Sequence, residues 1–432
     1  MTGNYMNQLN RSYENQTKLM EQSDGSSLHR PSDNAVNYSK YLRFETSLSE
    51  NTQYQSNVNT AISWMSTSDS AMVSMTDIMQ TIVEKTTSAA NGTNNTESMA
   101  AIGKEMLAEV QELVSLGNTQ QGDRYVFSGQ SDLVQPFSIS SDEQARGLTK
   151  TLDDKQKSFF NTADNTGSIS QMITLTGSDG NTYYANTLNG KVYTKSFVDS
   201  GYKDKIAAGQ TTVSDADAAG TLTVDKTFIS SNFENTGVIK TGTGVGTNWK
   251  GSIEVDGSAV TLSFATVKQN IVTYKGDDKY ISMVKKNGAV ESSSDTVNVT
   301  GQDMFGSDLF DDANSGNTRS GTAVLNDLLT VQSKTAAADN NWLSSDGMTL
   351  SDNAHATVVK AETKLASRQQ VYTQVNSMLS TQNTSITSDI TDVSSTDVAA
   401  FAVQLMTAQT IYNMSLSVGS KILPKSLADY LS

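Results

Sequence analysis

Histidine occurs at two positions in the 432 residues, and histidine is the first side chain to inspect for metal or acid–base chemistry. His29 lies in a predicted turn and His355 in a predicted helix, far apart in the sequence. Neither belongs to a His-Glu-x-x-His motif, the spacing that places two zinc ligands on one helical face. Both are therefore interpreted as ordinary surface residues.

Glycine spacing gives no nucleotide site. Gly242, Gly244 and Gly246 alternate as in a dinucleotide-binding loop, but Thr247 stands where the motif needs its third glycine. No Gly-Lys-Ser/Thr phosphate loop occurs. We interpret residues 241–246 as a linker or a long turn.

Acidic clusters are equally weak signals for a site. Asp215, Asp217 and Gly220 resemble a calcium loop, yet Lys226 occupies the position of the bidentate glutamate. A second cluster, with no complementary acid or base, contains Asp308, Asp311 and Asp312. We therefore expect a protein that is not an enzyme, with no catalytic residue, no cofactor and no metal.

Composition narrows the class of partner. The net charge of −15 and the sequence pI near 4.6 argue against nucleic acid and against anionic membranes. No apolar run is long enough to cross a bilayer, and residues 1–10 lack the apolar core of a signal peptide. The chain contains no cysteine, which excludes disulfides and thiolate metal sites.

Long helices account for much of the chain. Residues 34–90 contain neither glycine nor proline, and a seam of apolar residues at spacings of three, four and seven includes Val58, Ile62, Met65, Met72, Met79 and Val83. A turn at 91–95 and a shorter helix ending at Gly117 complete a predicted hairpin. The methionine stripe at Met65, Met72, Met75 and Met79 is interpreted as core packing.

A second long helix is predicted over residues 353–391. Its heptad positions are apolar or aromatic at Val358, Leu365, Tyr372, Leu379, Ile386 and Val393. Companion positions such as Arg368 do not fit a core, so this helix needs partners from elsewhere in the chain. We predict that it forms one antiparallel bundle with residues 34–118.

Between these helices the period changes to two, and turn signals at 176–181 and 255–258 indicate an all-β region. The predicted fold is α+β and multidomain: a long antiparallel helical bundle or coiled coil built from both ends, with a β-rich domain inserted. The predicted domains are 1–33 with 395–432, 34–135 with 322–394, and the insert 136–321. The insert is expected to be dispensable for folding of the helices.

Both ends of the chain carry apolar stripes on short predicted helices. Neither stripe has an obvious cover except the other, so we predict that the ends order fully only on assembly with neighbouring subunits. The predicted assembly interface contains Met6, Leu9, Tyr13, Val398, Phe401, Leu405, Tyr412, Leu416, Ile422, Leu423, Leu427, Tyr430 and Leu431.

Four motifs resemble one known family. They are Ser23-x-Gly25-x-x-Leu28-x-x-Pro31-Ser32-Asp33-Asn34-Ala35, the segment 124–129, the pair of segments 274–277 and 299–306, and the C-terminal run 408–431. Together and in this order they are similar to the flagellins and their hook-associated relatives, over about residues 1–135 and 270–432.

The resemblance implies a structural adaptor of the bacterial flagellum, at the junction between hook and filament. It also implies self-association in a ring or helical layer, contact with the preceding hook-associated junction protein and with flagellin, and export through the flagellar type III channel after binding a cytoplasmic chaperone. The alternatives are a filament flagellin, or a ligand-binding or enzymatic module in the β insert.

Overall fold

The computed structural model describes residues 2–150, 172–186, 191–195, 221–223, 234–241, 244–255, 257–281, 296–306 and 322–422. These residues form two compact units, one from Met1–Thr60 and Thr373–Ser432, the other from Ala61–Tyr372. The three-part domain division stays a prediction. The candidate calcium loop and the cluster at 308–312 lie outside the described residues.

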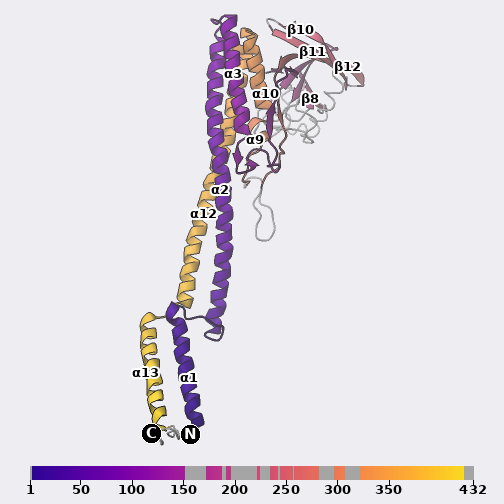
Figure 1. Cartoon of the computed structure of the whole chain (residues 1–432). Coiled ribbons are helices and arrows are strands. Elements are labelled where there is room, and N and C mark those ends of the chain that lie inside the picture. The colour runs from indigo at the N-terminus through magenta and orange to yellow at the C-terminus, as the bar shows by residue number, and fades with distance from the viewer. Residues whose placement is uncertain are drawn as a thin grey trace, which may run out of the picture. The chain divides into compact units, whose positions relative to one another are not determined.

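The long helices of the described chain lie close to the predicted positions, and shorter helices that the sequence did not reveal lie between them in the chain. They are α1 (Thr2–Glu21), the 3-10 turn η1 (Gln22–Asp24), α2 (Ala35–Ala90), α3 (Thr96–Gly117), α9 (Gly301–Phe305), α10 (Ala323–Ala336), α11 (Asn340–Trp342), the π-helical turn η4 (Leu343–Gly347), α12 (Met348–Ser394) and α13 (Val398–Ile422). Figure 1 shows them with the strands.

The antiparallel pairing of α2 with α12 is confirmed within each unit. In the first unit the Asn51 side-chain amide donates to the Leu379 carbonyl oxygen, 2.9 Å away. In the second, the Thr86 and Ser351 hydroxyls lie 3.0 Å apart. Residue numbers rise along α2 as they fall along α12, so the helices run in opposite directions.

The seam of α2 differs in detail from the prediction. The four methionines of the stripe are buried, as expected, but Ile62 and Val83 are only half-buried. The buried positions beside them are Ala61 and Ile82, and two polar residues, Ser68 and Thr86, continue the seam. Each of those hydroxyls donates to a backbone carbonyl four residues earlier in the helix, which removes the cost of burying it.

Arg368 of α12 corrects the prediction that this position does not fit a core. Its side chain is buried, and its guanidinium donates to the Asn298 carbonyl oxygen at 3.3 Å. A buried arginine is tolerated here because a backbone acceptor from outside the helical hairpin meets it. The companion position therefore binds the loop that precedes α9.

Antiparallel strands confirm the β-rich region. They are β1 (Gln120–Gln121), β2 (Arg124–Tyr125), β3 (Phe137–Ile139), β4 (Gln144–Gly147), β5 (Thr149–Lys150), β6 (Met172–Gly177), β7 (Thr182–Asn186), β8 (Lys191–Thr194), β9 (Thr221–Thr223), β10 (Glu234–Thr241), β11 (Gly244–Val255), β12 (Ser258–Gln269) and β13 (Val272–Tyr274). Within the described chain, nine of them form one sheet whose main order is β10-β11-β12-β6-β7-β8-β9, with β4 on β12 and β5 on β6.

The predicted turns at 176–181 and 255–258 join strands of this sheet. Gly180 and Gly257 have φ near +79° and +75°, which glycine adopts without strain. The linker interpretation of 241–246 is wrong for its second half: β11 already begins at Gly244, which pairs with Thr241. Gly244 and Gly246 are therefore strand residues.

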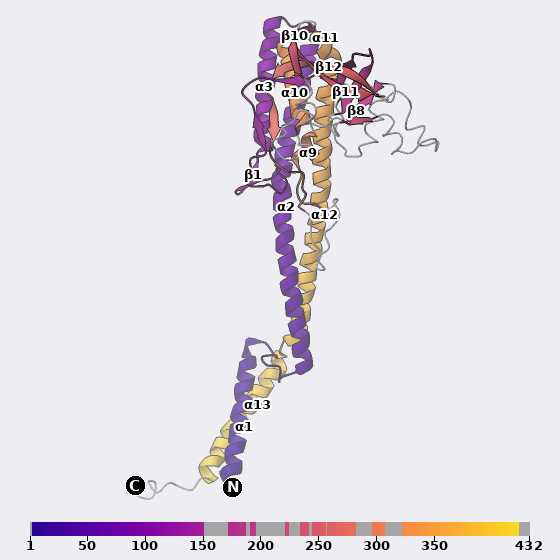
Figure 2. The ribbon, with the colours of Figure 1, turned by 90° about the vertical axis from the view of Figure 1, so that its right-hand side faces the viewer.

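Helix α10, which the sequence did not reveal as a separate element, lies between α3 and β12 (Figures 1 and 2). The Asp327 carboxylate on α10 accepts from the Arg146 guanidinium of β4 at 3.0 Å, and both side chains are fully buried. The Gln269 side-chain amide of β12 donates to the Asn326 carbonyl oxygen at 2.9 Å. The sheet is thus attached to the helices by buried polar contacts.

An aromatic cluster closes the junction between α3 and the strands. The ring of Phe137 lies 4.9 Å from that of Tyr274 and 5.4 Å from that of Phe305, centroid to centroid. Gly117, at the end of α3, faces Phe137 so closely that an added Cβ would lie 2.7 Å from the ring. Burial raises the pKa of the Tyr274 hydroxyl, which donates to the Phe127 carbonyl oxygen. Tyr274 is therefore a structural residue of the core.

Candidate assembly interface

Helices α1 and α13 of the first unit lie side by side and run in opposite directions (Figures 1 and 2). The rings of Tyr13 and Tyr412 lie 6.2 Å apart, centroid to centroid. The Tyr5 hydroxyl donates to the Ser415 carbonyl oxygen at 2.7 Å. The structure therefore brings two predicted interface residues, Tyr13 and Tyr412, together within one chain.

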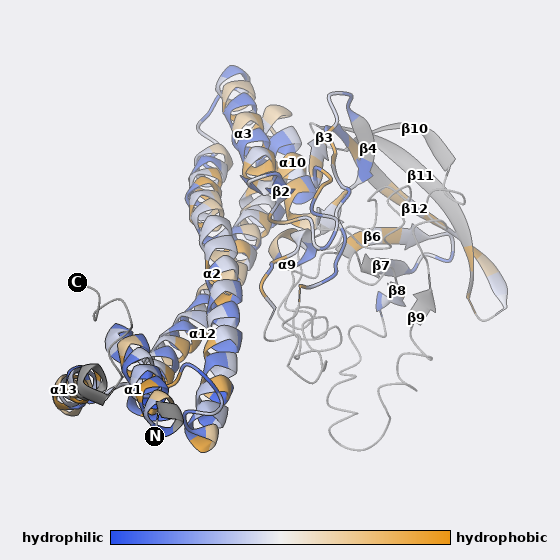
Figure 3. Ribbon diagram, turned by 60° about the horizontal axis from the view of Figure 1, so that its bottom comes forward, coloured by the Kyte–Doolittle hydropathy of each residue, from blue (hydrophilic) through white to orange (hydrophobic). Residues whose placement is uncertain are grey.

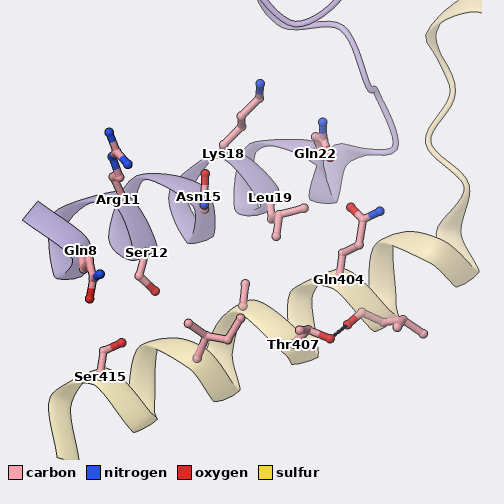
Figure 4. Close-up of a pocket in the computed structure, with 13 residues that line it drawn as sticks. Gln8, Arg11, Ser12, Asn15, Lys18, Leu19, Gln22, Gln404, Thr407 and Ser415 are labelled. Atoms are coloured by element: carbon pink, nitrogen blue, oxygen red, sulfur yellow. Dashed lines mark hydrogen bonds between the residues drawn. The ribbon is translucent and has the colours of Figure 1, made fainter. Parts of the chain in front are cut away.

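A groove of about 720 Å³ runs between α1 and α13 (Figure 4). Arg11 and Lys18 line one wall, whereas Val403 and Ile411 line the other. The Lys18 ammonium lies 3.0 Å from the Asp33 carboxylate. The groove is therefore mixed in character, with cations from α1 and apolar side chains from α13.

The connectors that lead into the terminal helices also pair with each other. The Ser27 backbone N–H donates to the Ser394 carbonyl oxygen at 2.6 Å, and the Thr396 N–H donates to the Gly25 carbonyl oxygen at 3.0 Å. Gly25 has φ of +89°, a conformation that favours glycine. The motif that resembled the flagellins thus contains a joint between the two ends of the chain.

Two contacts with aspartate side chains lie beside this joint. The His29 imidazole beside Asp24 is the largest cause of the lowered pKa of that carboxyl, and the two groups are 2.9 Å apart. The hydrogen bond from Lys18 likewise lowers the pKa of Asp33. His29 therefore makes a local hydrogen bond with Asp24, as a structural residue of the connector.

Helix α13 presents apolar side chains on more than one side, and it carries no charged residue from Val398 to Ser420. Its exposed apolar side chains include Val398, Val403 and Met406, which are 72%, 64% and 69% exposed. Thr407 and Thr410 donate their hydroxyls to carbonyl oxygens within the helix. Figure 3 shows hydrophobic residues on α13. A helix of this kind is normally covered on most sides.

The predicted interface residues divide into three groups. Leu9, Phe401, Leu405 and Tyr412 are half-buried. The exposed ones are Met6, Tyr13, Val398 and Leu416. Ile422 ends α13, and its side chain lies outside the described residues, as do Leu423, Leu427, Tyr430 and Leu431. As an interface, the whole set stays a prediction.

Sequence reasoning missed four apolar residues of α13 that the structure leaves exposed. They are Val403, Met406, Ile411 and Met414. A search for a single stripe overlooked them, because they lie on other sides of the helix than Phe401, Leu405 and Tyr412. The absence of charge from Val398 to Ser420 was the available signal.

Chemistry elsewhere in the described residues is limited. No group of three or more histidine, aspartate or glutamate residues there is arranged to hold a metal ion. The same residues contain no helix long and apolar enough to cross a membrane. Tyr280, whose pKa is raised by burial, donates to the Asp303 carboxylate at 2.9 Å. This contact joins the loop before α9 to its capping residue.

Comparison with known proteins finds sequence matches to flagellar proteins. Residues 1–132 match the bacterial flagellin N-terminal helical region. Flagellar hook-associated protein 3 of Salmonella typhimurium is 30% identical over 122 residues, 28% of this chain and 38% of that protein. The protein of the same name from Escherichia coli is 28% identical over 119 residues, 27% of this chain and 38% of that protein. The match thus spans well under half the length of either relative.

A match to a solved structure, the flagellar junction protein FlgL from Legionella pneumophila, covers 82% of this chain and 100% of that one, with 12% identity and a TM-score of 0.36. Residues 1–132 are thus similar to the N-terminal region of the flagellin family. The segment that matches the curated relatives is similar to flagellar hook-associated protein 3.

Proposed function

We propose that this chain is a non-enzymatic structural component of the bacterial flagellum that links the hook-associated zone to the flagellin filament. The family match over residues 1–132 and the names of the sequence relatives support this role. The structural observation that carries it is α13, a helix without charge from Val398 to Ser420 that α1 covers on one side only.

The free sides of α13 give a physical reason for assembly. Each large apolar side chain removed from water contributes about 1.5–3 kcal/mol, before the cost of ordering is subtracted. Copies of the same chain arranged head-to-tail provide such cover along a tube without closing into a dimer. The remaining expected partners are the preceding hook-associated junction protein, flagellin and a cytoplasmic export chaperone. Secretion to the hook tip belongs to the same proposal.

An in vitro capping assay tests this function. Isolated hooks that carry the preceding junction protein are incubated with the purified chain, and bound chain is located by immunogold electron microscopy. We expect gold at hook tips and a layer of limited thickness. Long filaments formed by the chain alone would instead favour a filament subunit, and absence of gold at the tips would contradict the junction role.

A variant with Met406→Asp and Met414→Asp tests whether α13 carries the binding. Two carboxylates on the exposed face should reduce tip binding by at least about tenfold, because each would be buried without a partner. The matched control, Gln111→Asp with Ser115→Asp, places two carboxylates at exposed positions of α3. Equal binding by both variants would exclude the α13 face as the interface.

A further inference from the structure

Methionines of the described residues are divided sharply between the two units. Those of the second unit that are fully buried, with at most 1% exposure, are Met65, Met72, Met75, Met79, Met99, Met106 and Met304. Those that are between 49% and 69% exposed all lie in the first unit, at Met6, Met20, Met378, Met406 and Met414. Exposed thioethers are thus concentrated in the unit that carries the proposed assembly helix.

Two of these methionines share one face of α13. At about 100° per residue, Val403, Met406 and Met414 lie within an arc of about 80°. Met406 and Met414 are 69% and 63% exposed. Thr410, between them, donates its hydroxyl to the Met406 carbonyl oxygen at 2.7 Å and so leaves its methyl group as part of the face. The face is therefore apolar, with two accessible sulfur atoms.

Thioether sulfur is the most readily oxidised group available, because the chain contains no cysteine. Hydrogen peroxide transfers one oxygen atom to the methionine sulfur. The sulfur loses two electrons to form a sulfoxide, the peroxide O–O bond breaks, and water leaves. The product is polar, chiral and a hydrogen-bond acceptor, whereas the thioether is apolar.

We propose that Met406 and Met414 form an oxidation-sensitive site, at which peroxides convert the unassembled chain into a form that cannot assemble. This inference rests on the proposed function, because α13 must become buried for the modification to act. A sulfoxide buried without a donor should weaken binding by about tenfold at each position. The bundle methionines should resist, since no peroxide reaches a sulfur atom inside a closed core.

Peptide mapping tests the first half of the proposal. The purified full-length chain is treated with increasing hydrogen peroxide, catalase removes the excess, and mass spectrometry measures sulfoxide at each methionine. We expect Met406 and Met414 to oxidise at least about tenfold faster than Met72 and Met75. Equal rates at all four positions would overturn the assignment, whatever the chain does on hooks.

Tip binding tests the second half. Wild-type chain oxidised and then freed of peroxide should show at least about tenfold less gold at hook tips than untreated chain. For the variant Met406→Leu with Met414→Leu, the ratio of tip binding after treatment to its own tip binding before treatment should stay near one, because leucine has no sulfur to oxidise. Methionine sulfoxide reductases should restore the oxidised wild type.

A matched control carries Met20→Leu with Met378→Leu, two methionines that are also exposed and that lie outside the predicted assembly interface. It should remain as sensitive to peroxide as the wild type. Loss of binding by the oxidised Met406→Leu, Met414→Leu variant would overturn the proposal and leave the junction role standing. Failure of the untreated wild type to bind hook tips would instead count against the junction role itself.

Discussion

The buried ion pair between Arg146 and Asp327 predicts a large and specific loss of stability. The guanidinium and carboxylate are 3.0 Å apart, and neither side chain has measurable exposure. The Thr149 hydroxyl donates to the same Asp327 oxygen at 2.7 Å, and Arg146 donates to the Thr330 hydroxyl at 3.0 Å. Arg146→Met removes the cation and leaves the carboxylate in a dry environment, which should cost about 3–5 kcal/mol.

The double variant Arg146→Met with Asp327→Leu isolates the interaction energy between the two side chains from their interactions with neighbouring residues. Replacing a buried ion pair by apolar groups of similar volume is often neutral. We expect the double variant to lie within about 1.5 kcal/mol of the wild type, so the coupling energy from the four-member cycle should exceed about 2 kcal/mol. Urea unfolding followed by circular dichroism gives each free energy of unfolding.

A pair whose cation is exposed gives the matched control. Arg124 and Asp132 are 2.7 Å apart, but the Arg124 side chain is 57% exposed. Arg124→Met should therefore cost less than about 1 kcal/mol. If Arg146→Met were equally mild, or if the double variant were as unstable as the sum of the single ones, the reasoning from burial would be refuted.

Three further predictions concern other parts of the chain. Burial is the main cause, and the Glu362 carboxylate the next, of the raised pKa of Asp69. Asp69→Asn should therefore stabilise the protein by less than about 1 kcal/mol at pH 7, and this gain should vanish below the ordinary aspartate pKa. The urea midpoint of unfolding, measured against pH, checks this. Gly129 has φ of +71° and its missing Cβ would overlap the Asp277 backbone, so Gly129→Ala should lower stability by several kcal/mol in thermal unfolding. Amide exchange in the monomer should be fast across 398–416, and strong protection there would contradict folding coupled to assembly.

How far the sequence predicts the helices is clear from α2. Its length follows from the absence of glycine and proline, and the structure confirms it. Its seam was placed on large residues such as Ile62, whereas the buried position is Ala61. Burial at this position depends on how closely a partner helix approaches. A small side chain is harder than a large one to recognise from the sequence as a buried contact. Thr86, buried beside Ser351, makes the same point with a polar residue.

In the sheet, the sequence predicts the turns but not the order of the strands. The turn residues predicted its hairpins, because Gly180 and Gly257 indicate tight turns whatever the final order of the strands. The strand order and the contact between Arg146 and Asp327, 181 residues apart, depend on non-local packing that no local pattern encodes. Nothing in the types of these two residues distinguishes a buried pair from two solvated charges.

Helix α13 depends both on a local pattern that the sequence shows and on non-local packing that it does not. The stripe of Phe401, Leu405 and Tyr412 was predicted from spacing, and the structure leaves all three only half-buried. If that stripe were the whole apolar surface, pairing with α1 would largely satisfy the helix, and no subunit contact would be required. Met406 and Met414 lie on another side and remain exposed. A helix without charge from Val398 to Ser420, with one side covered and another open, has a physical reason to bind, and that reason exists before any relative is considered.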